Sequence, residues 1–260
     1  MNKNTLLYRL CFAFALVLLA PGAAAQDLPP KLAELWVLEI EPGQGEAFRA
    51  GVKAHVAFRQ ELGDPRPWQA YVPLLGDNLN RFVVRHCCFE WADADTYRQW
   101  DEDHPEVGAH YVEHVAPHTA SAAHFFETID WANSHWSDAG GPYSLFAITE
   151  FRVTPGNSGA FDEARVKLSQ IAIQNGWASD DHAWLWLSSI GGEPTQAIAI
   201  PHRDFASLAG RQPTFADFLA ERMGSPEKAA EMMQSLMSAV ATIDYQIWEH
   251  QPDLSMPEQE

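Results

Sequence analysis

The chain has 260 residues, of which 17 are lysine or arginine and 35 are aspartate or glutamate. Its net charge of −18 argues against binding to nucleic acid or to an anionic lipid surface, because both carry charge of the same sign. The three cysteines exclude a disulfide framework, so the fold must rest on a core drawn from the 47% of residues that are hydrophobic.

The first 25 residues have the three-part pattern of a secretory signal peptide. Lys3 and Arg9 precede the apolar run CFAFALVLLA, and the small residues of PGAAA follow it. This run is shorter than the about 20 residues that a membrane-spanning helix needs. We therefore expect cleavage after Ala25, export to the periplasm or the extracellular space, and no stable membrane insertion of the mature chain.

The rest of the chain contains an internal repeat. TIDW at 128–131 returns as TIDY at 242–245, and EPGQGEAF at 41–48 returns as TPGNSGAF at 154–161. The offsets, 114 and 113 residues, differ by one insertion. The sequence therefore predicts two copies of one unit, at 33–136 and 143–253, with a linker at 137–142 and a C-terminal tail at 254–260.

Both copies predict the same succession of elements. Apolar, β-branched segments that end at a Pro-Gly turn indicate first strands, and stretches that begin in small polar residues indicate helices. The first copy is expected to have strands at 34–40, 67–75 and 81–89, helices at 44–62 and about 117–127, and a polar connection at 93–106. The second is expected to have strands at 145–153, 182–190 and 196–205, and helices at 157–175 and 225–241. A short last strand is expected after each TID motif.

The order β-α-β-β-α-β is the ferredoxin-like plan, an antiparallel sheet with two helices on one face. The strand expected at 196–205 is mostly apolar on both faces, so we expect the two sheets to pack together as an internal pseudo-dimer. The unit, its Pro-Gly turn and Trp91-Ala92-Asp93 after the third strand resemble the dimeric α+β barrel superfamily, which includes antibiotic-biosynthesis monooxygenase-like and NIPSNAP-like domains. The resemblance implies an α+β fold, and dimers or tandem fusions. Because the superfamily hosts oxygenases, isomerases and haem enzymes, it does not imply one function.

Histidines recur at every fourth position in HYVEHVAPH, as His110, His114 and His118. On an unbroken helix they would share one face and, with a carboxylate nearby, could bind zinc or copper. Pro117 predicts a helix break before His118. We favour a solvated polar stripe and keep a metal site as the alternative.

A second candidate lies in RHCC at 85–88, where side chains of a strand alternate between the faces. His86 and Cys88 share one face, and Cys88 corresponds to His202 in the second copy. The favoured interpretation is core packing; a metal or haem held by these residues is the alternative.

A third candidate is a polar and aromatic lining made of Arg85, Glu150, Arg152, Trp184 and Trp186. Aromatic walls with a few polar groups are typical of a pocket for a flat organic ligand, although they are also typical of a tryptophan-rich core. The main hypothesis is therefore an exported protein that binds a small aromatic ligand, with no cofactor predicted and a homo-oligomer left open.

The alternative hypothesis is a monooxygenase-type enzyme that needs little or no cofactor. In such an enzyme His86, His118 and His182 would move protons, because histidine titrates near neutral pH. Metal or haem binding through histidines of the first copy is a third hypothesis. Eight of the eleven histidines lie in the first copy, so we expect any site to be there.

Overall fold

The computed structural model describes residues 30–210 and 212–256. The expected signal peptide at 1–25 and the end of the expected tail lie outside the described residues. None of the helices within these two ranges is long and apolar enough to cross a membrane.

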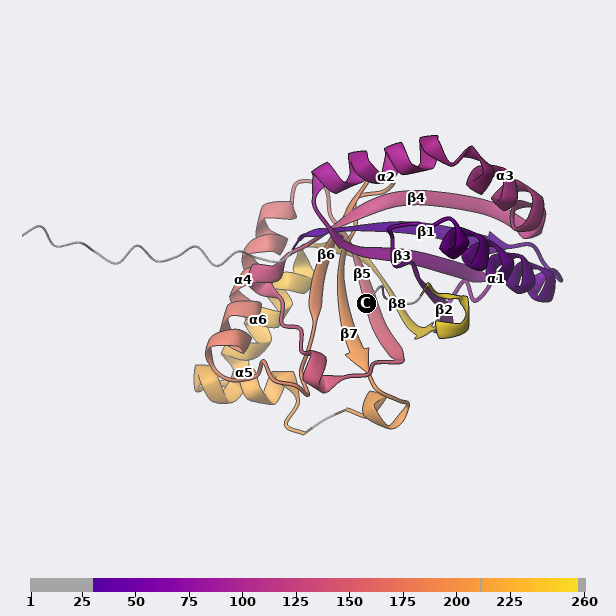
Figure 1. The fold of residues 1–260 in the computed structure, drawn as a ribbon. Coiled ribbons are helices and arrows are strands. Elements are labelled where there is room, and N and C mark those ends of the chain that lie inside the picture. Colours follow the sequence, from indigo (N-terminus) through magenta and orange to yellow (C-terminus); the bar gives the residue numbers. More distant parts are fainter. Residues whose placement is uncertain (1–29, 211, 257–260) are drawn as a thin grey trace, which may run out of the picture.

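Eight antiparallel strands form one closed barrel in the order β1-β3-β2-β8-β5-β7-β6-β4 (Figure 1). The predicted α+β class is confirmed, and the barrel closes within one chain. The strands are β1 (Leu32–Ile40), β2 (Gln69–Leu75), β3 (Arg81–Phe89), β4 (Thr119–Ile129), β5 (Leu145–Val153), β6 (Leu185–Ile190), β7 (Gln196–His202) and β8 (Val240–His250).

Six α-helices of the described ranges lie outside the barrel, three beside the strands of each half (Figure 1). We call 33–136 the first half and 143–253 the second half. The helices are α1 (Gly45–Glu61), α2 (Trp91–Asp103), α3 (Pro105–His114), α4 (Ser158–Gln174), α5 (Phe215–Met223) and α6 (Pro226–Ser238). In both halves the turn before the first helix places a glycine in the left-handed region, Gly43 at φ +82° and Gly156 at φ +88°.

The alternation of side chains along each strand separates two kinds of core. Ala33 and Leu35 of β1 point into the barrel, where they cluster with Val83 and pack against Trp248 from the other half. Leu38 of the same strand points outward and packs against Phe48 of α1. The first half therefore has a second core on the outward side of the sheet, between the strands and the helices.

Two of the expected elements in the first half are wrong. The stretch expected to be a helix at about 117–127 is mostly β4, which pairs with β1 along its length. The expected polar connection at 93–106 is largely α2, whose first turn is fixed by a capping box between Glu90 and Asp93. The TID motifs accordingly lie at the end of β4 and within β8, and not before the last strands. The break at Pro117 is confirmed, because α3 ends at His114 and only a short 3-10 helix follows.

Candidate functional site

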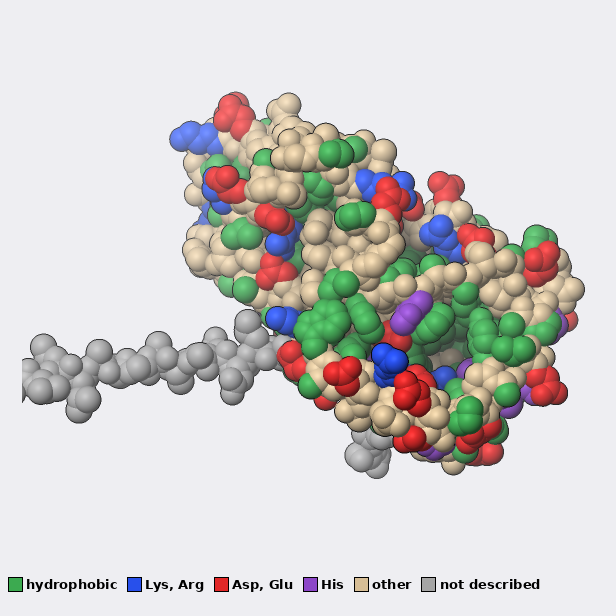
Figure 2. All heavy atoms as spheres, turned by 90° about the horizontal axis from the view of Figure 1, so that it is seen from above, with side chains coloured by type: hydrophobic (Ala, Val, Ile, Leu, Met, Phe, Trp, Pro, Cys, Tyr) green, Lys and Arg blue, Asp and Glu red, His purple; other side chains and the backbone are tan. Residues whose placement is uncertain are grey.

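A cavity of about 100 Å³ lies on the outward side of the first half's sheet, bounded by α1, α3, β1 and β3. We call it the first-half cavity. Its apolar lining includes Leu38, Val52, Val56, Phe82, Val84 and Val115. Figure 2, which looks onto the face carrying α2, α3 and β4, shows apolar side chains gathered at a hollow with a histidine and charged groups close by. The described residues thus provide an apolar chamber with polar groups near it.

Trp36, near the middle of β1, forms one wall of this cavity and is 37% exposed. Its indole stacks on the imidazole of His124, with ring centroids 4.0 Å apart and planes 8° apart. This stacking follows from strand register, because Trp36 and His124 are directly opposite each other in the β1–β4 pair.

Glu34 holds both rings in place from two positions earlier on the same face of β1. Its Oε1 atom accepts a hydrogen bond from His124 Nε2 at 2.8 Å and one from Trp36 Nε1 at 3.4 Å. Glu34 is 8% exposed, whereas the His124 side chain is 38% exposed. The group therefore combines a buried carboxylate, an accessible imidazole and an indole wall, and we call it the Trp36–His124–Glu34 group.

His86, one of the predicted proton-moving residues, is on β3, where it lies directly opposite Glu34 of β1. It is 2% exposed, stacks on Phe89 at 4.9 Å and meets the edge of Tyr97. Its Nδ1 atom has no hydrogen-bond partner among the described residues. Burial lowers the pKa of His86 to about 4, and the charge of Glu34 opposes this only in part. His86 is thus a neutral, enclosed imidazole behind Glu34.

The predicted histidine stripe is only partly brought together. His110 and His114 are neighbours with ring centroids 4.2 Å apart, and His55 of α1 joins them, its Nδ1 3.3 Å from His110 Nδ1. His118 lies beyond the helix break, in the 3-10 helix. Among the described residues, no group of three or more histidine, cysteine or acidic side chains is arranged to hold a metal ion.

His55 also lines the first-half cavity, so the histidine cluster borders the candidate site. Burial lowers the pKa of His55 to about 3, and the charges of Arg59 and His110 add to this effect. His55 was not singled out in the sequence because only the packing of α1 on α3 makes it a neighbour of His110.

An ion-pair network holds the polar edge of the cavity in place. The sequence did not indicate this network. Asp64 is fully buried and pairs with both Arg59 and Arg66, and Arg66 also reaches Asp101 of α2. Burial acts to raise the pKa of Asp64, but hydrogen bonds from Arg66 and the charge of Arg59 outweigh it, so the pKa is lowered. The network ties the loop after α1 to α2 and keeps Arg59 beside the cavity.

The predicted charged lining of Arg85, Glu150 and Arg152 is divided between two places. Arg85 and Glu127 face each other inside the barrel, with Nε and Oε2 3.7 Å apart. Glu150, with a pKa raised by burial and by Asp244, is on the inward face of β5. Arg152 pairs with Glu193 at 3.1 Å and lines an open groove of about 720 Å³ at the start of α4. These three residues do not form one ligand site.

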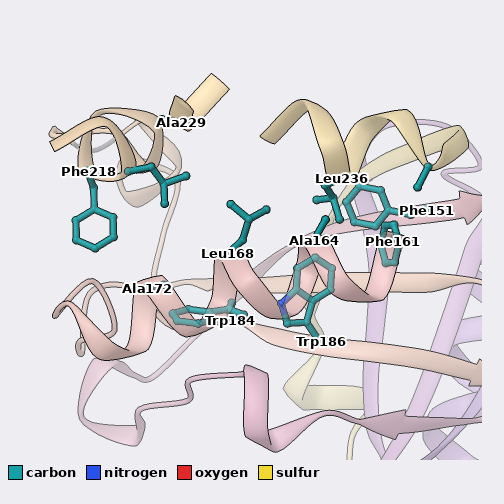
Figure 3. Packing of buried hydrophobic residues seen from close by; sticks show 12 residues of the cluster. Phe151, Phe161, Ala164, Leu168, Ala172, Trp184, Trp186, Phe218, Ala229 and Leu236 are labelled. Carbon is teal, nitrogen blue, oxygen red and sulfur yellow. The ribbon is translucent and has the colours of Figure 1, made fainter. Parts of the chain in front are cut away.

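The predicted aromatic wall of Trp184 and Trp186 is the core of the second half (Figure 3). Both indoles are buried and have fixed partners: Trp184 Nε1 donates to the carbonyl of Asn133 and Trp186 Nε1 to Ser169 Oγ. His182 stacks on Trp177 at 3.9 Å, away from the first-half cavity. The outward side of the second sheet is thus filled where the first sheet has a cavity.

A haem does not fit Cys88 and His202, the pair of strand residues that the sequence offered for it. The first-half cavity is well below the roughly 300–1,000 Å³ of usual cofactor and ligand pockets. Cys88 is joined to Cys87 in a disulfide, and His202 Nδ1 is 2.9 Å from the carbonyl oxygen of Ser207.

Comparisons with known proteins place the fold. No protein-family model and no curated protein matches this chain. A provisionally named monooxygenase from Lactobacillus acidophilus NCFM matches with 8% identity and a TM-score of 0.51, covering 88% of this chain and 97% of that one. A mutant chlorite dismutase from Candidatus Nitrospira defluvii matches with 10% identity and a TM-score of 0.52, covering 85% and 92%.

The same chlorite dismutase in complex with imidazole matches with 9% identity and a TM-score of 0.50, covering 86% of this chain and 92% of that one. At such identities the likeness shows the fold alone, and this is the α+β barrel shared by the monooxygenase-like proteins and chlorite dismutase. What the barrel does in this chain must be argued from its own residues.

Proposed function

We propose that this protein binds a small aromatic ligand in the first-half cavity, with the indole of Trp36 as the stacking surface. The observation that carries the proposal is an apolar cavity whose wall is a partly exposed indole held in place by Glu34 and His124. An exposed aromatic ring that is fixed on both its edge and its face is preorganised, so a ligand does not have to immobilise it.

The polar group at the wall adds selectivity for a hydroxylated ring. Because His124 Nε2 is hydrogen-bonded to Glu34, the other ring nitrogen, Nδ1, is the acceptor of a neutral imidazole. His124 stacks on Trp36 but does not itself line the cavity, so we place the phenolic hydroxyl at the opening of the cavity, where it would donate to this nitrogen while the ring lies against apolar side chains. A simple phenol is therefore the ligand class that matches both the apolar cavity and the imidazole.

The test is a calorimetric titration of phenol into the wild type and two tryptophan variants. Trp36→Leu removes the stacking wall and is expected to weaken binding by about tenfold, since an aromatic pair contributes about 0.5–1.5 kcal/mol beyond its buried area. Trp91→Leu changes another partly exposed tryptophan, outside the cavity, and is expected to bind as the wild type does. Equal phenol affinity in all three proteins would refute the proposal.

A second candidate function, a monooxygenase-type oxidation, is favoured by the pairing of His124 with Glu34. A carboxylate that orients a histidine beside a bound phenol makes the histidine a general base. His124 Nδ1 would take one phenolic proton of a hydroquinone, and Glu34 would stabilise the resulting imidazolium. The hydroquinone anion would then give two electrons to dioxygen, which takes up its second proton and the proton held by His124, so that benzoquinone and hydrogen peroxide form. Of the predicted proton-moving residues, His86 is enclosed and His118 and His182 lie elsewhere, so we assign this role to His124.

The oxidation hypothesis is tested by dioxygen consumption with hydroquinone as the substrate. The wild type should consume dioxygen faster than His124→Gln, while both bind phenol. Turnover that does not differ between the two proteins would leave binding alone as the function.

We further propose that the chain is exported and arose by duplication of a ferredoxin-like unit. The repeated motifs, the signal-peptide pattern and the same order of strands and helices in both halves support this. Mass spectrometry of the exported protein should find Gln26 as the first residue; an N-terminus at Met1 in the mature protein would contradict export by cleavage.

A further inference from the structure

The first-half cavity is completed by a segment from the other end of the chain. Residues 251–256, which follow β8, run back across the edge of the first half, and we call them the C-terminal strap. Backbone hydrogen bonds join Gln251 N to the carbonyl of Ala70 at 2.8 Å and Met256 N to the carbonyl of Trp68 at 2.7 Å. Ser255 Oγ accepts a third hydrogen bond from Ala70 N at 2.9 Å. The strap is thus fixed on β2.

Leu254 is the side chain that the strap inserts. It is 3% exposed and packs in the cluster that contains Phe48 and Val52 of α1. It also lines the first-half cavity, on which Trp36 forms another wall. A residue after the last strand of the second half therefore forms part of the wall of the cavity in the first half.

We propose that Leu254 restricts the first-half cavity to ligands with a single aromatic ring, such as phenols, and excludes fused-ring compounds. The proposal deepens the proposed function and rests on it. A cavity of about 150 Å³ lined by apolar side chains holds one benzene molecule. The first-half cavity, at about 100 Å³, is smaller than this, so a single ring would fill it and lie partly at its opening, and no enclosed space would be left for a second ring.

Removing the Leu254 side chain beyond its Cβ should add the missing space. The wall at this position would then be the backbone of the strap, which its own hydrogen bonds hold in place independently of the leucine. We therefore expect the Leu254→Ala variant to keep the strap and to accept a second ring.

The experiment measures the dissociation constants of phenol and of 1-naphthol by calorimetry for wild type and Leu254→Ala. In the wild type phenol should bind at least about tenfold more tightly than 1-naphthol, and in Leu254→Ala this preference should fall at least about tenfold. The matched control is Leu236→Ala, which makes the same deletion in the buried core of the second half and should keep the preference of the wild type.

Each outcome bears on one of the two proposals. If phenol binds the wild type and a folded Leu254→Ala protein keeps the same preference, the size limit does not come from Leu254 and the inference is refuted. If neither compound binds the wild type, the proposed function fails, and the size limit fails with it. Should Leu254→Ala not fold, Leu254→Val deletes a single carbon and should reduce the preference by a smaller amount; an unchanged preference there refutes the inference as well.

Discussion

Acid should destabilise this protein partly through His86, and replacing His86 by phenylalanine should remove that part. The folded protein keeps His86 neutral down to its lowered pKa of about 4, whereas in the unfolded chain the imidazole takes up a proton below the ordinary value of 6.5. Between these two values the unfolded state binds more protons, so the free energy of unfolding falls as the pH falls. Above 6.5 both states are neutral and His86 contributes no pH dependence.

The size of the effect follows from the difference between the two pKa values. Each unit corresponds to about 1.4 kcal/mol, so the shift of His86 from 6.5 to about 4 costs up to about 3 kcal/mol once the pH has passed through the whole range. In His86→Phe the new ring occupies the place between Phe89 and Tyr97 and removes the Nδ1 atom that has no partner. The variant should therefore lose less stability on acidification than the wild type.

Urea unfolding followed by circular dichroism at several pH values between about 4 and 7.5 measures this difference. The difference in the free energy of unfolding, His86→Phe minus wild type, should rise by roughly 2–3 kcal/mol as the pH falls from about 7.5 to about 4. Phe89→Leu is the matched control, because it disturbs the same packing without changing a titratable group, and its curve should run parallel to that of the wild type. Parallel curves for His86→Phe and the wild type would refute the reasoning.

Three further perturbations test other parts of the structure. Gly51→Ala should destabilise the protein by several kcal/mol in thermal unfolding, because the added Cβ would lie at the carbonyl oxygen of His114. Gly108 has open space around it, so Gly108→Ala should stabilise α3 by up to about 1 kcal/mol. Equal effects of the two substitutions on stability would contradict the packing of α1 on α3. Trp186→Ala should cost about 3–5 kcal/mol of stability and leave phenol affinity unchanged in calorimetry, as expected for a core residue outside the cavity, and a loss of affinity would place it in the site. Glu150→Gln should raise the free energy of unfolding at neutral pH, because burial and Asp244 raise the pKa of this carboxyl and its charge opposes folding; a decrease would show that the carboxylate is stabilised by a cation.

Much of the fold was predictable because it depends on local patterns. The repeated Pro-Gly turn and the alternation in the first strands indicated the α+β class. The apolar strand at 196–205 predicted two packed sheets buried on both faces, whereas the two halves join in one closed barrel and Ile200 is 38% exposed. The main error was at 119–129, where the alanine-rich start of β4 resembles a helix. Pairing with β1 along the whole strand decided its structure, and this contact is not visible in the segment itself.

The same error concealed most of the candidate site. Glu34 and Trp36 are two residues apart in β1, on one face, but they become a site only when His124 lies opposite Trp36 in β4. With 117–127 taken as a helix, no such partner could be found. A strand prediction for 119–129 would have aligned His124 with the first strand and indicated the group.

The tryptophans of the second half illustrate a different limit. Tryptophans such as Trp184 and Trp186 are found both in the walls of ligand pockets and in cores. The volume of the side chains that pack beside them decides which of the two they form. In the structure Phe161, Leu168 and Leu236 fill the space beside them (Figure 3). In the first half Ala70 pairs with Val84 where Trp186 pairs with Ile198 in the second, and this difference in side-chain size between the two copies was the signal available in the sequence.

The most direct test of the account follows the indole N–H signals of the tryptophans by nuclear magnetic resonance while phenol is added. The signal of Trp36 is assigned by its loss in Trp36→Leu. The account predicts that the Trp36 signal shifts and saturates at one phenol per chain, whereas the signals of the buried Trp184 and Trp186 stay in place. A Trp36 signal that does not move while phenol binds elsewhere would contradict the central claim that this cavity is the ligand site.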